Sequence, residues 1–330
     1  MLTIKNDTLP FLSLMLGGCL LAQGCGADNP VESGGNVSSG VPSGSSVSSI
    51  EAISSAASVS SSVVASSEAG VSSQVMQSSQ AGSSSSAADA DEVLVCGDLA
   101  QGITAGRLNA AGKAHMLCLH NQTRSNVALG MFDGLNTPLD FATDMKRLQW
   151  DDKLAQVAGA WANRCVWEHN ANRTNEYNAL SPTDINGNVI GGRESVGENL
   201  AFMSASNATA VSFPFATRGY GLWEEEGAYY SFGDLQVSDY CAQAPCGHFT
   251  QLIWAATYKV GCEVNFCAAN TLSRYPATYL VCNYASAGNY IGRAPYQSSL
   301  LESDVCSDAD NGQSVCRQGL TESPDYQTGL

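Results

Sequence analysis

The residues with the clearest chemical potential lie in one short stretch, Cys246 to Thr257, which reads C-G-H-F-T-Q-L-I-W-A-A-T. His248 follows a cysteine and a glycine in a run that is mostly apolar. Its imidazole is therefore expected to lie against a packed core and to face a specific partner. A second stretch, Tyr279 to Tyr290, reads Y-L-V-C-N-Y-A-S-A-G-N-Y. The functional question is which groups the rest of the chain brings to His248.

His120 and Arg124 form a second pair of reactive residue types. They lie four residues apart in Ala110 to Asn126, a stretch without proline that carries helix formers. The spacing puts both side chains on one face of a predicted first helix. The pair could act in catalysis, but polar residues at this spacing more often join a helix to its neighbours by hydrogen bonds. We favour the structural role.

The composition excludes some classes of function. The 330 residues carry 31 acidic and 15 basic side chains, for a net charge of -16, which repels nucleic acid and anionic membrane surfaces. Twelve cysteines without a C-x-x-C pair indicate disulfides in an oxidising compartment rather than metal sites with cysteine ligands. The chain is predicted to hold one globular domain, because its amino-terminal part cannot build a core.

Residues 1–24 are predicted to be a secretory signal peptide, with Lys5 ahead of an uncharged run from Leu9 to Ala22. Both L-G-G-C, ending at Cys19, and A-Q-G-C, ending at Cys25, resemble the lipobox of bacterial lipoproteins. Lipidation of Cys25 leaves an even number of cysteines to pair, so Cys25 is the preferred attachment site. Ordinary cleavage without a lipid is the alternative.

Residues 25–92 are predicted to form a flexible tether. This segment is dominated by Ser, Ala, Val and Gly and cannot bury enough apolar surface to offset the entropy of ordering. A folded domain is expected over residues 93–300, followed by an acidic tail over 301–330.

Within the folded part, the patterns predict helices first and strands afterwards. Asp151 is expected to cap a second helix that ends near Glu168 and His169, and a loop follows from Asn170 to Gly192. A further helix after Pro214 holds Trp223 and three glutamates. Strands are predicted at Tyr258 to Cys267 and Thr278 to Tyr284, as an antiparallel pair. This order indicates an α+β domain.

Four motifs together resemble the CAP superfamily, which includes cysteine-rich secretory proteins, insect antigen 5 and plant pathogenesis-related proteins of group one. The motifs are Gly247 to Trp254 with Thr257, Cys282-Asn283-Tyr284 with Gly288-Asn289-Tyr290, His120-Asn121-x-x-Arg124, and Gly197-Glu198-Asn199-Leu200. Ser286 departs from the usual second signature. The resemblance implies an α-β-α sandwich with a central antiparallel sheet and a surface cleft.

The resemblance also implies the residues that line this cleft, two histidines and two acids. They are His169, Glu198, Glu226 and His248, and Glu226 is selected because it stands three places after Trp223. Asn170 follows His169 where serine is common in the family.

Three disulfides are implied by the resemblance: Cys165–Cys267, Cys241–Cys246 and Cys262–Cys282. The four remaining cysteines, Cys96, Cys118, Cys306 and Cys316, allow three pairings, of which we prefer Cys96–Cys118 with Cys306–Cys316.

Two histidines and two carboxylates in a cleft could have one of three roles. His169 and His248 could hold zinc, with the glutamates orienting them. The same groups could act in a peptidase-like or glycosidase-like hydrolase, or form a buried structural tetrad. We favour the metal-capable site because two of the four histidines of the chain fall at the cleft positions that the resemblance implies. The hydrolase has less support, since no G-x-S-x-G elbow or H-E-x-x-H helix is present.

The expected protein is a secreted, surface-tethered binding module that contacts a membrane through its lipid anchor, on the bacterial outer membrane or cell surface. Its expected ligand is a lipid or sterol, an extracellular polymer or a protein. Ala210 to Phe215 could form an apolar lipid-binding loop or could pack in the core.

Overall fold

The computed structural model describes residues 94–135, 137–184, 186–191, 194–236, 241, 244–307 and 315–322. They belong to one compact unit of the chain. The expected signal peptide, Cys19, Cys25 and the tether lie outside the described residues. Within the described part, none of the helices combines the length and apolarity needed to span a bilayer.

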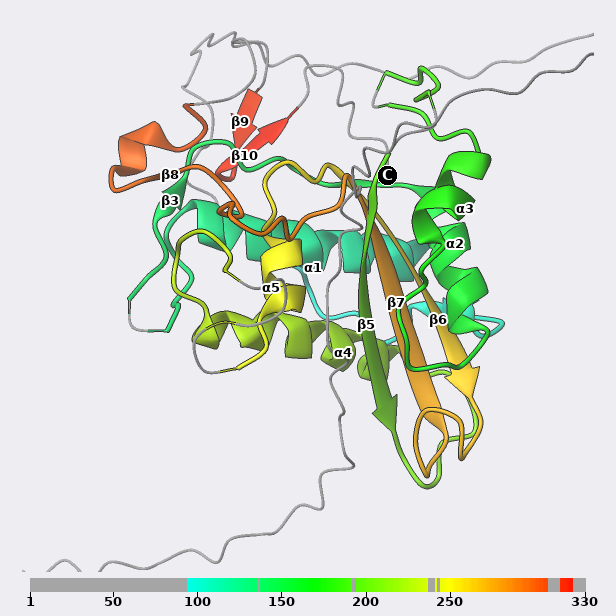
Figure 1. The fold of residues 1–330 in the computed structure, drawn as a ribbon. Coiled ribbons are helices and arrows are strands. Elements are labelled where there is room, and N and C mark those ends of the chain that lie inside the picture. Colours follow the sequence, from blue (N-terminus) through cyan, green and yellow to red (C-terminus); the bar gives the residue numbers. More distant parts are fainter. Residues whose placement is uncertain are drawn as a thin grey trace, which may run out of the picture. The chain divides into compact units, whose positions relative to one another are not determined.

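A four-stranded sheet in the order β4-β6-β7-β5 forms the centre of the domain (Figure 1). The long strands β5 (Val196–Ser204), β6 (Lys259–Cys267) and β7 (Ala277–Ala285) are antiparallel. The short strand β4 (Gln149–Trp150) joins β6 in parallel, so the sheet is mixed at this edge rather than wholly antiparallel. Every residue of β7 is buried, as expected for a strand covered on both faces.

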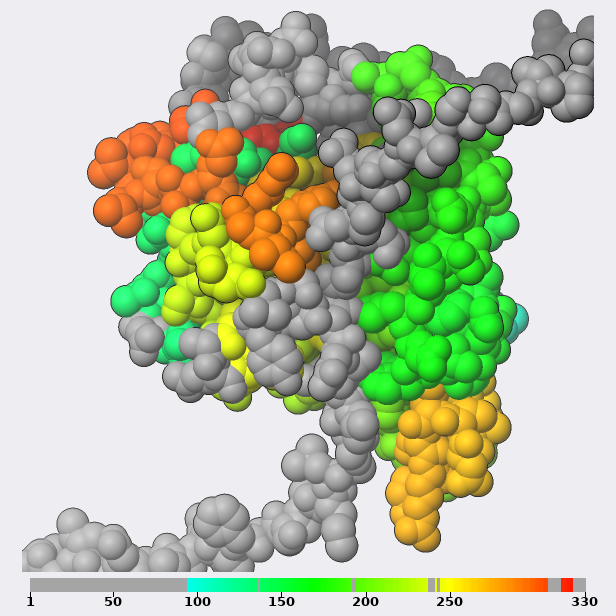
Figure 2. Space-filling view, in the orientation of Figure 1, coloured from blue at the N-terminus to red at the C-terminus, as the bar shows by residue number. Residues whose placement is uncertain are grey.

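Helices cover both faces of the sheet, which gives the expected α-β-α sandwich (Figure 1). On one face lie α2 (Asp152–Ala162) and α3 (Arg173–Ala179), and Trp161 packs with Tyr279 and Val281 of β7. On the other face lie α1 (Ala110–Ala128), α4 (Phe213–Glu225) and α5 (Gly247–Leu252). The strand alternation explains this division, because successive side chains of β7 point to opposite layers. Figure 2 shows the tip between β6 and β7 projecting beyond the surrounding helices.

Short elements complete the domain. They are β1 (Ile103–Thr104), β2 (Arg107–Leu108), β3 (Phe141–Ala142), η1 (Glu226–Tyr229), β8 (Ser298–Ser299), η2 (Glu302–Asp304), β9 (Val315–Arg317) and β10 (Leu320–Glu322).

The second helix begins as expected but ends earlier. Asp151 caps it by accepting hydrogen bonds from the backbone N–H groups of Lys153 and Leu154. It ends at Ala162 rather than near His169, because the chain turns at Cys165, whose φ of 52° does not continue a helix. The expected loop after Asn170 contains α3, so that loop assignment was incomplete.

Five disulfides join the described cysteines, and they connect the same pairs that were expected. The pairs are Cys96–Cys118, Cys165–Cys267, Cys241–Cys246, Cys262–Cys282 and Cys306–Cys316. Cys165–Cys267 closes the longest loop, with a sequence separation of 102 residues, and ties the segment after α2 to the end of β6. Pairing on this scale requires an oxidising compartment.

The carboxyl-terminal hairpin packs on the domain, so the expected boundary at residue 300 lies too early. Leu320 is fully buried, and the backbone N–H of Thr321 donates to the carbonyl oxygen of Met145. Arg147 and Glu322 form an ion pair at 2.5 Å between largely buried side chains. Packing contacts with the domain therefore continue beyond residue 300, at Leu320, Thr321 and Glu322.

Arg124 joins three separate segments inside the core. Its side chain is fully buried, and its guanidinium nitrogens donate hydrogen bonds to five backbone carbonyl oxygens. One carbonyl belongs to Lys146, and the other four are those of Leu252, Trp254, Ala255 and Thr257. The favoured structural role of the His120/Arg124 motif agrees with these contacts, because Arg124 fixes the turn that follows α5.

Replacing Arg124 with lysine should destabilise the domain by about 3 kcal/mol or more, because an ammonium group has three donors and cannot reach all five carbonyls. The measurement is denaturant unfolding of the full chain with its disulfides intact. Arg274→Lys is the matched control, since Arg274 is exposed, and it should change stability by less than about 0.5 kcal/mol. Equal effects of the two substitutions would contradict the proposed role of Arg124.

Candidate functional site

Glu226 and His248 form one half of the tetrad. The His248 Nδ1 atom lies 2.7 Å from Glu226 Oε1, and both side chains are almost fully buried. The other carboxylate oxygen, Oε2, accepts from the backbone N–H groups of His248 at 2.9 Å and Phe249 at 3.3 Å. The cap residue of α5, Cys246, offers no side-chain hydrogen bond. Glu226 thus caps the helix that carries His248 and also orients its ring.

Glu198 and His169 repeat this arrangement in the other half. Glu198 Oε1 lies 2.9 Å from His169 Nδ1 and accepts from the backbone N–H of Asn170 at 2.9 Å. Asn283, paired with Glu198 across β5 and β7, donates to Glu198 Oε2 at 3.2 Å when its amide is oriented to satisfy both of its neighbours. Its amide oxygen then accepts from the backbone N–H of Ala158.

Both halves are attached to β5, an edge strand of the four-stranded sheet, but no three of the tetrad side chains bring possible ligand atoms within 4.8 Å of one another. Glu198 holds His169, and the next residue, Asn199, donates from its side-chain amide to the backbone carbonyl of His248 at 3.1 Å. Successive side chains of a strand point to opposite faces. The histidine–glutamate pairs are therefore anchored on the two sides of β5.

Both histidines have one ring nitrogen in use and one free. Each Nδ1 faces a carboxylate, which accepts a hydrogen bond, so Nδ1 is the donor, and in the neutral ring the lone pair lies on Nε2. Within the described part of the chain, His169 Nε2 and His248 Nε2 are buried and have no hydrogen-bond partner. A carboxylate behind Nδ1 and a bare Nε2 form the arrangement that metal-binding histidines use.

Trp223 and Asn283 support the tetrad, although neither was assigned a role from sequence. The Trp223 ring stacks on His248, with centroids 5.9 Å apart and planes inclined by 15°, and its Nε1 donates to the Leu200 carbonyl. Trp223 served in the sequence only to locate Glu226. The sequence did contain a signal for Asn283, because a polar residue within an apolar strand is expected to have a buried hydrogen-bond partner.

The His120 motif lies apart from this chemistry. His120 Nδ1 donates to the Met116 carbonyl at 2.6 Å, and Nε2 is 3.0 Å from the Tyr284 hydroxyl. Asn121 bonds to the backbone of Leu148 through both its amide nitrogen and its oxygen.

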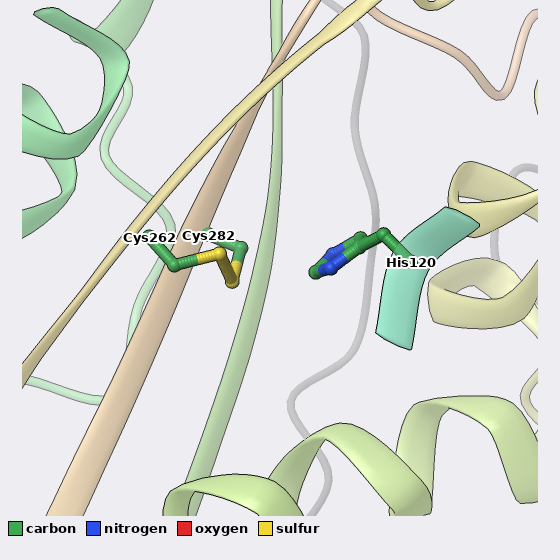
Figure 3. A group of neighbouring side chains, drawn as sticks. All are labelled: His120, Cys262 and Cys282. Atoms are coloured by element: carbon green, nitrogen blue, oxygen red, sulfur yellow. A yellow bond between two sulfur atoms is a disulfide. The ribbon is translucent and has the colours of Figure 1, made fainter. Parts of the chain in front are cut away.

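A second group of potential ligands surrounds His120. His120 points toward Cys262 and Cys282 (Figure 3), and potential ligand atoms of the three side chains lie within 4.8 Å of one another. The two sulfur atoms form a disulfide, and both His120 nitrogens have partners. The group therefore has no thiolate and no free imidazole lone pair to offer a metal.

The segment from Ala210 to Phe215 does not form an exposed apolar loop. Phe213 begins α4, is 3% exposed and packs in the main core cluster. The two alternatives for this segment were an apolar lipid-binding loop and core packing. Phe213 packs in the core.

A profile of the cysteine-rich secretory protein family, CAP, matches residues 117–284. GLIPR1-like protein 1 from Bos taurus is 34% identical over 194 residues, which cover 58% of this chain and 66% of that protein. Venom allergen 5 from Vespa mandarinia is 33% identical over 195 residues, covering 58% and 83% respectively. Peptidase inhibitor 16 from Mus musculus is 35% identical over 211 residues, covering 64% of this chain but 33% of its own length.

Among solved structures, NaASP2 with Zn²⁺ has a TM-score of 0.50 and 26% identity, covering 67% of this chain and 100% of that one. The sandwich and the paired histidines and glutamates define a secretory-type α-β-α domain. The chain belongs to the cysteine-rich secretory protein, or CAP, family.

Burial lowers the pKa of His120 to about 4, with a smaller lowering by Arg124, while its bond to Met116 opposes the shift. Between pH 6.5 and 4 the unfolded chain binds a proton at this histidine and the folded chain does not. Stability should therefore fall by about 3 kcal/mol as pH drops through this window. Unfolding free energies measured from pH 7 to 4 should show this slope, and His120→Gln should remove it. Parallel pH curves would contradict the assignment.

Replacing Glu226 with alanine should destabilise the domain by about 3 kcal/mol, because three buried donors lose their shared acceptor. Glu225→Ala is the matched control. Glu225 is exposed and pairs with Arg218, so its loss should cost less than about 1 kcal/mol. Denaturant unfolding of both variants measures the difference, and similar values would rule out a capping role for Glu226.

Proposed function

We propose that this CAP domain binds a divalent metal ion, with zinc as the best match, through Nε2 of His169 and Nε2 of His248. The observation that carries the proposal is the pair of buried, unpartnered Nε2 atoms. A buried polar atom without a partner is costly, and imidazole nitrogen is a preferred zinc ligand. Bound zinc would act as a Lewis acid and would require one or two further ligands from water or from a bound molecule.

The charge of the tetrad supports a cation. Glu198 and Glu226 are buried, and among the described residues neither forms an ion pair with a lysine or arginine. Buried carboxylates are stabilised by hydrogen bonds and by nearby positive charge. A divalent ion on the two histidines would supply that charge beside both carboxylates. The solved NaASP2 structure contains Zn²⁺ and shares this fold, which adds support from a relative.

The domain is proposed to act as a binding module rather than a catalyst. No described hydroxyl or thiol hydrogen-bonds to either free Nε2 atom, so the tetrad lacks the nucleophile–base contact of an acyl-transfer enzyme. The ligand classes that we propose are a lipid, a cell-wall or other extracellular polymer, or a protein. A hydrolase remains the rival function.

The location and layout proposed for the whole chain follow from its sequence. The signal peptide, the lipidated Cys25 and the tether would display the domain outside the cell, on a bacterial surface. The five disulfides agree with an extracellular compartment.

Zinc added to the full, chelator-treated chain should bind in a calorimetric titration, and His169→Ala or His248→Ala should abolish binding. At a free zinc concentration of 100 times its Kd, the wild-type protein should gain about 2.7 kcal/mol of stability. Neither variant should show this gain.

His115→Ala is the matched control, since it removes a histidine outside the tetrad, and it should bind zinc like the wild type. Equal zinc binding by His248→Ala would refute the site. Turnover on peptide, ester or glycan substrates that is lost in Glu226→Gln would instead favour the hydrolase.

A further inference from the structure

The β6–β7 tip, residues 268–276, projects from the domain (Figure 2). It lies outside the β ladder, whose last pair is Cys267 with Ala277. Arg274 and Tyr275 are exposed in this tip, and the Arg274 guanidinium lies over the Tyr275 ring, with its Cζ atom 5.7 Å from the ring centroid. An exposed loop tip is a preferred point of attack for peptidases on a folded chain.

The base of the β6–β7 tip is held on both sides. On the β6 side, Cys267 forms its disulfide with Cys165. On the β7 side, the carbonyl oxygen of Pro276 accepts a hydrogen bond from the backbone N–H of Ala205, at 3.1 Å. A chemical change within the tip should therefore leave the sheet intact.

The backbone of Arg274 is available to a partner. Within the described part of the chain, neither its N–H group nor its carbonyl oxygen makes a hydrogen bond. The next residue, Tyr275, donates its backbone N–H only to the side-chain oxygen of Ser273, at 3.1 Å. An enzyme that binds an extended peptide forms hydrogen bonds with its main chain, as an added strand does. Arg274 can form such bonds without first losing any of its own.

The other exposed arginines are less available. Among the described residues, each has its backbone in a helix, a strand pair or a turn hydrogen bond, and they are Arg164, Arg218, Arg293 and Arg317. Arg293, for example, donates its backbone N–H to the Tyr290 carbonyl and accepts from the N–H of Leu235. A peptidase would have to break these bonds before it could bind there.

The segment that precedes the domain offers no competing basic residue. The sequence contains no lysine or arginine between Lys5 and Arg107. A peptidase that cuts after basic residues therefore has no target in the proposed tether. Such an enzyme would modify the domain without releasing it from its proposed anchor.

We propose that the Arg274–Tyr275 bond is a processing site for serine peptidases whose specificity pocket holds a carboxylate, the group that pairs with an arginine side chain. Hydrolysis would break the amide bond between the two residues and consume one water molecule. It would leave a carboxylate on Arg274 and an amino group on Tyr275. This processing is independent of the metal site proposed at the tetrad.

The cut domain would persist as a two-chain protein. Of the five disulfides, only Cys262–Cys282 joins residues on opposite sides of the cut. It would hold the fragment from Tyr275 to Leu330 on the rest of the chain. The ladder between β6 and β7 lies outside the cut bond and would also remain.

Limited digestion of the full, disulfide-intact chain with trypsin tests the proposal. The first product should gain the mass of one water molecule, and it should run as one band without reductant and as two bands with it. Mass spectrometry should place the first cut after Arg274. A first cut at any other basic residue, including Arg193 outside the described residues, would overturn the proposal. A folded chain that resists trypsin, or that binds it without being cut, would do the same.

Two substitutions at Arg274 and one control locate the site. Arg274→Gln should slow the first cut at least about tenfold, because the remaining basic residues become accessible only when the fold opens. Arg274→Lys should still be cut, since it keeps the positive charge that the pocket binds. Arg293→Gln is the matched control, because it removes another exposed arginine, and it should be cut like the wild type. Equal digestion of Arg274→Gln and the wild type would refute the site.

Discussion

The position of His248 depends on two buried charges that hold α5 from its two ends. This helix has six residues, too few to be stable by itself. Glu226 accepts from the backbone N–H groups of its first turn, and Arg124 donates to the carbonyls of Leu252 and of the turn that follows. Each charge also complements the helix dipole at its end. The site is therefore rigid because of distant residues, one on α1 and one after α4.

The two histidines are held in the same way by unrelated segments. In each half a glutamate accepts one hydrogen bond from the Nδ1–H group of the histidine and another from a neighbouring backbone N–H. The ring and its local backbone are thus fixed by one carboxylate. Such pre-organisation lowers the entropy that a ligand would lose on binding, because the Nε2 lone pairs already have fixed directions. The halves differ in access, since the His169 side chain is 18% exposed and that of His248 is 3% exposed.

Sequence patterns predicted the elements whose signals are local. The caps and apolar periodicity of α2 and the β-branched, aromatic character of β6 and β7 are such signals. The helix α3 was missed because it is short and polar and has no side-chain cap. The burial of Leu320 on the domain depends on contacts with residues more than a hundred positions away, such as Met145. The four tetrad residues came from the family resemblance, but the capping of α5 by Glu226 required the fold, because 22 residues separate Glu226 from His248.

Three consecutive glutamates show why a run of like charges in a sequence need not form a patch in space. Each residue of a helix is rotated by about 100° from the last, so neighbours face different surroundings. Glu224 accepts a hydrogen bond from Thr123 of α1, Glu225 lies in solvent with Arg218, and Glu226 is buried against His248. The change from α4 to the η1 turn occurs at Glu226. One run of identical residues therefore supplies a hydrogen bond between α4 and α1, a surface ion pair and the support of a histidine. No sequence pattern distinguishes these roles without the fold.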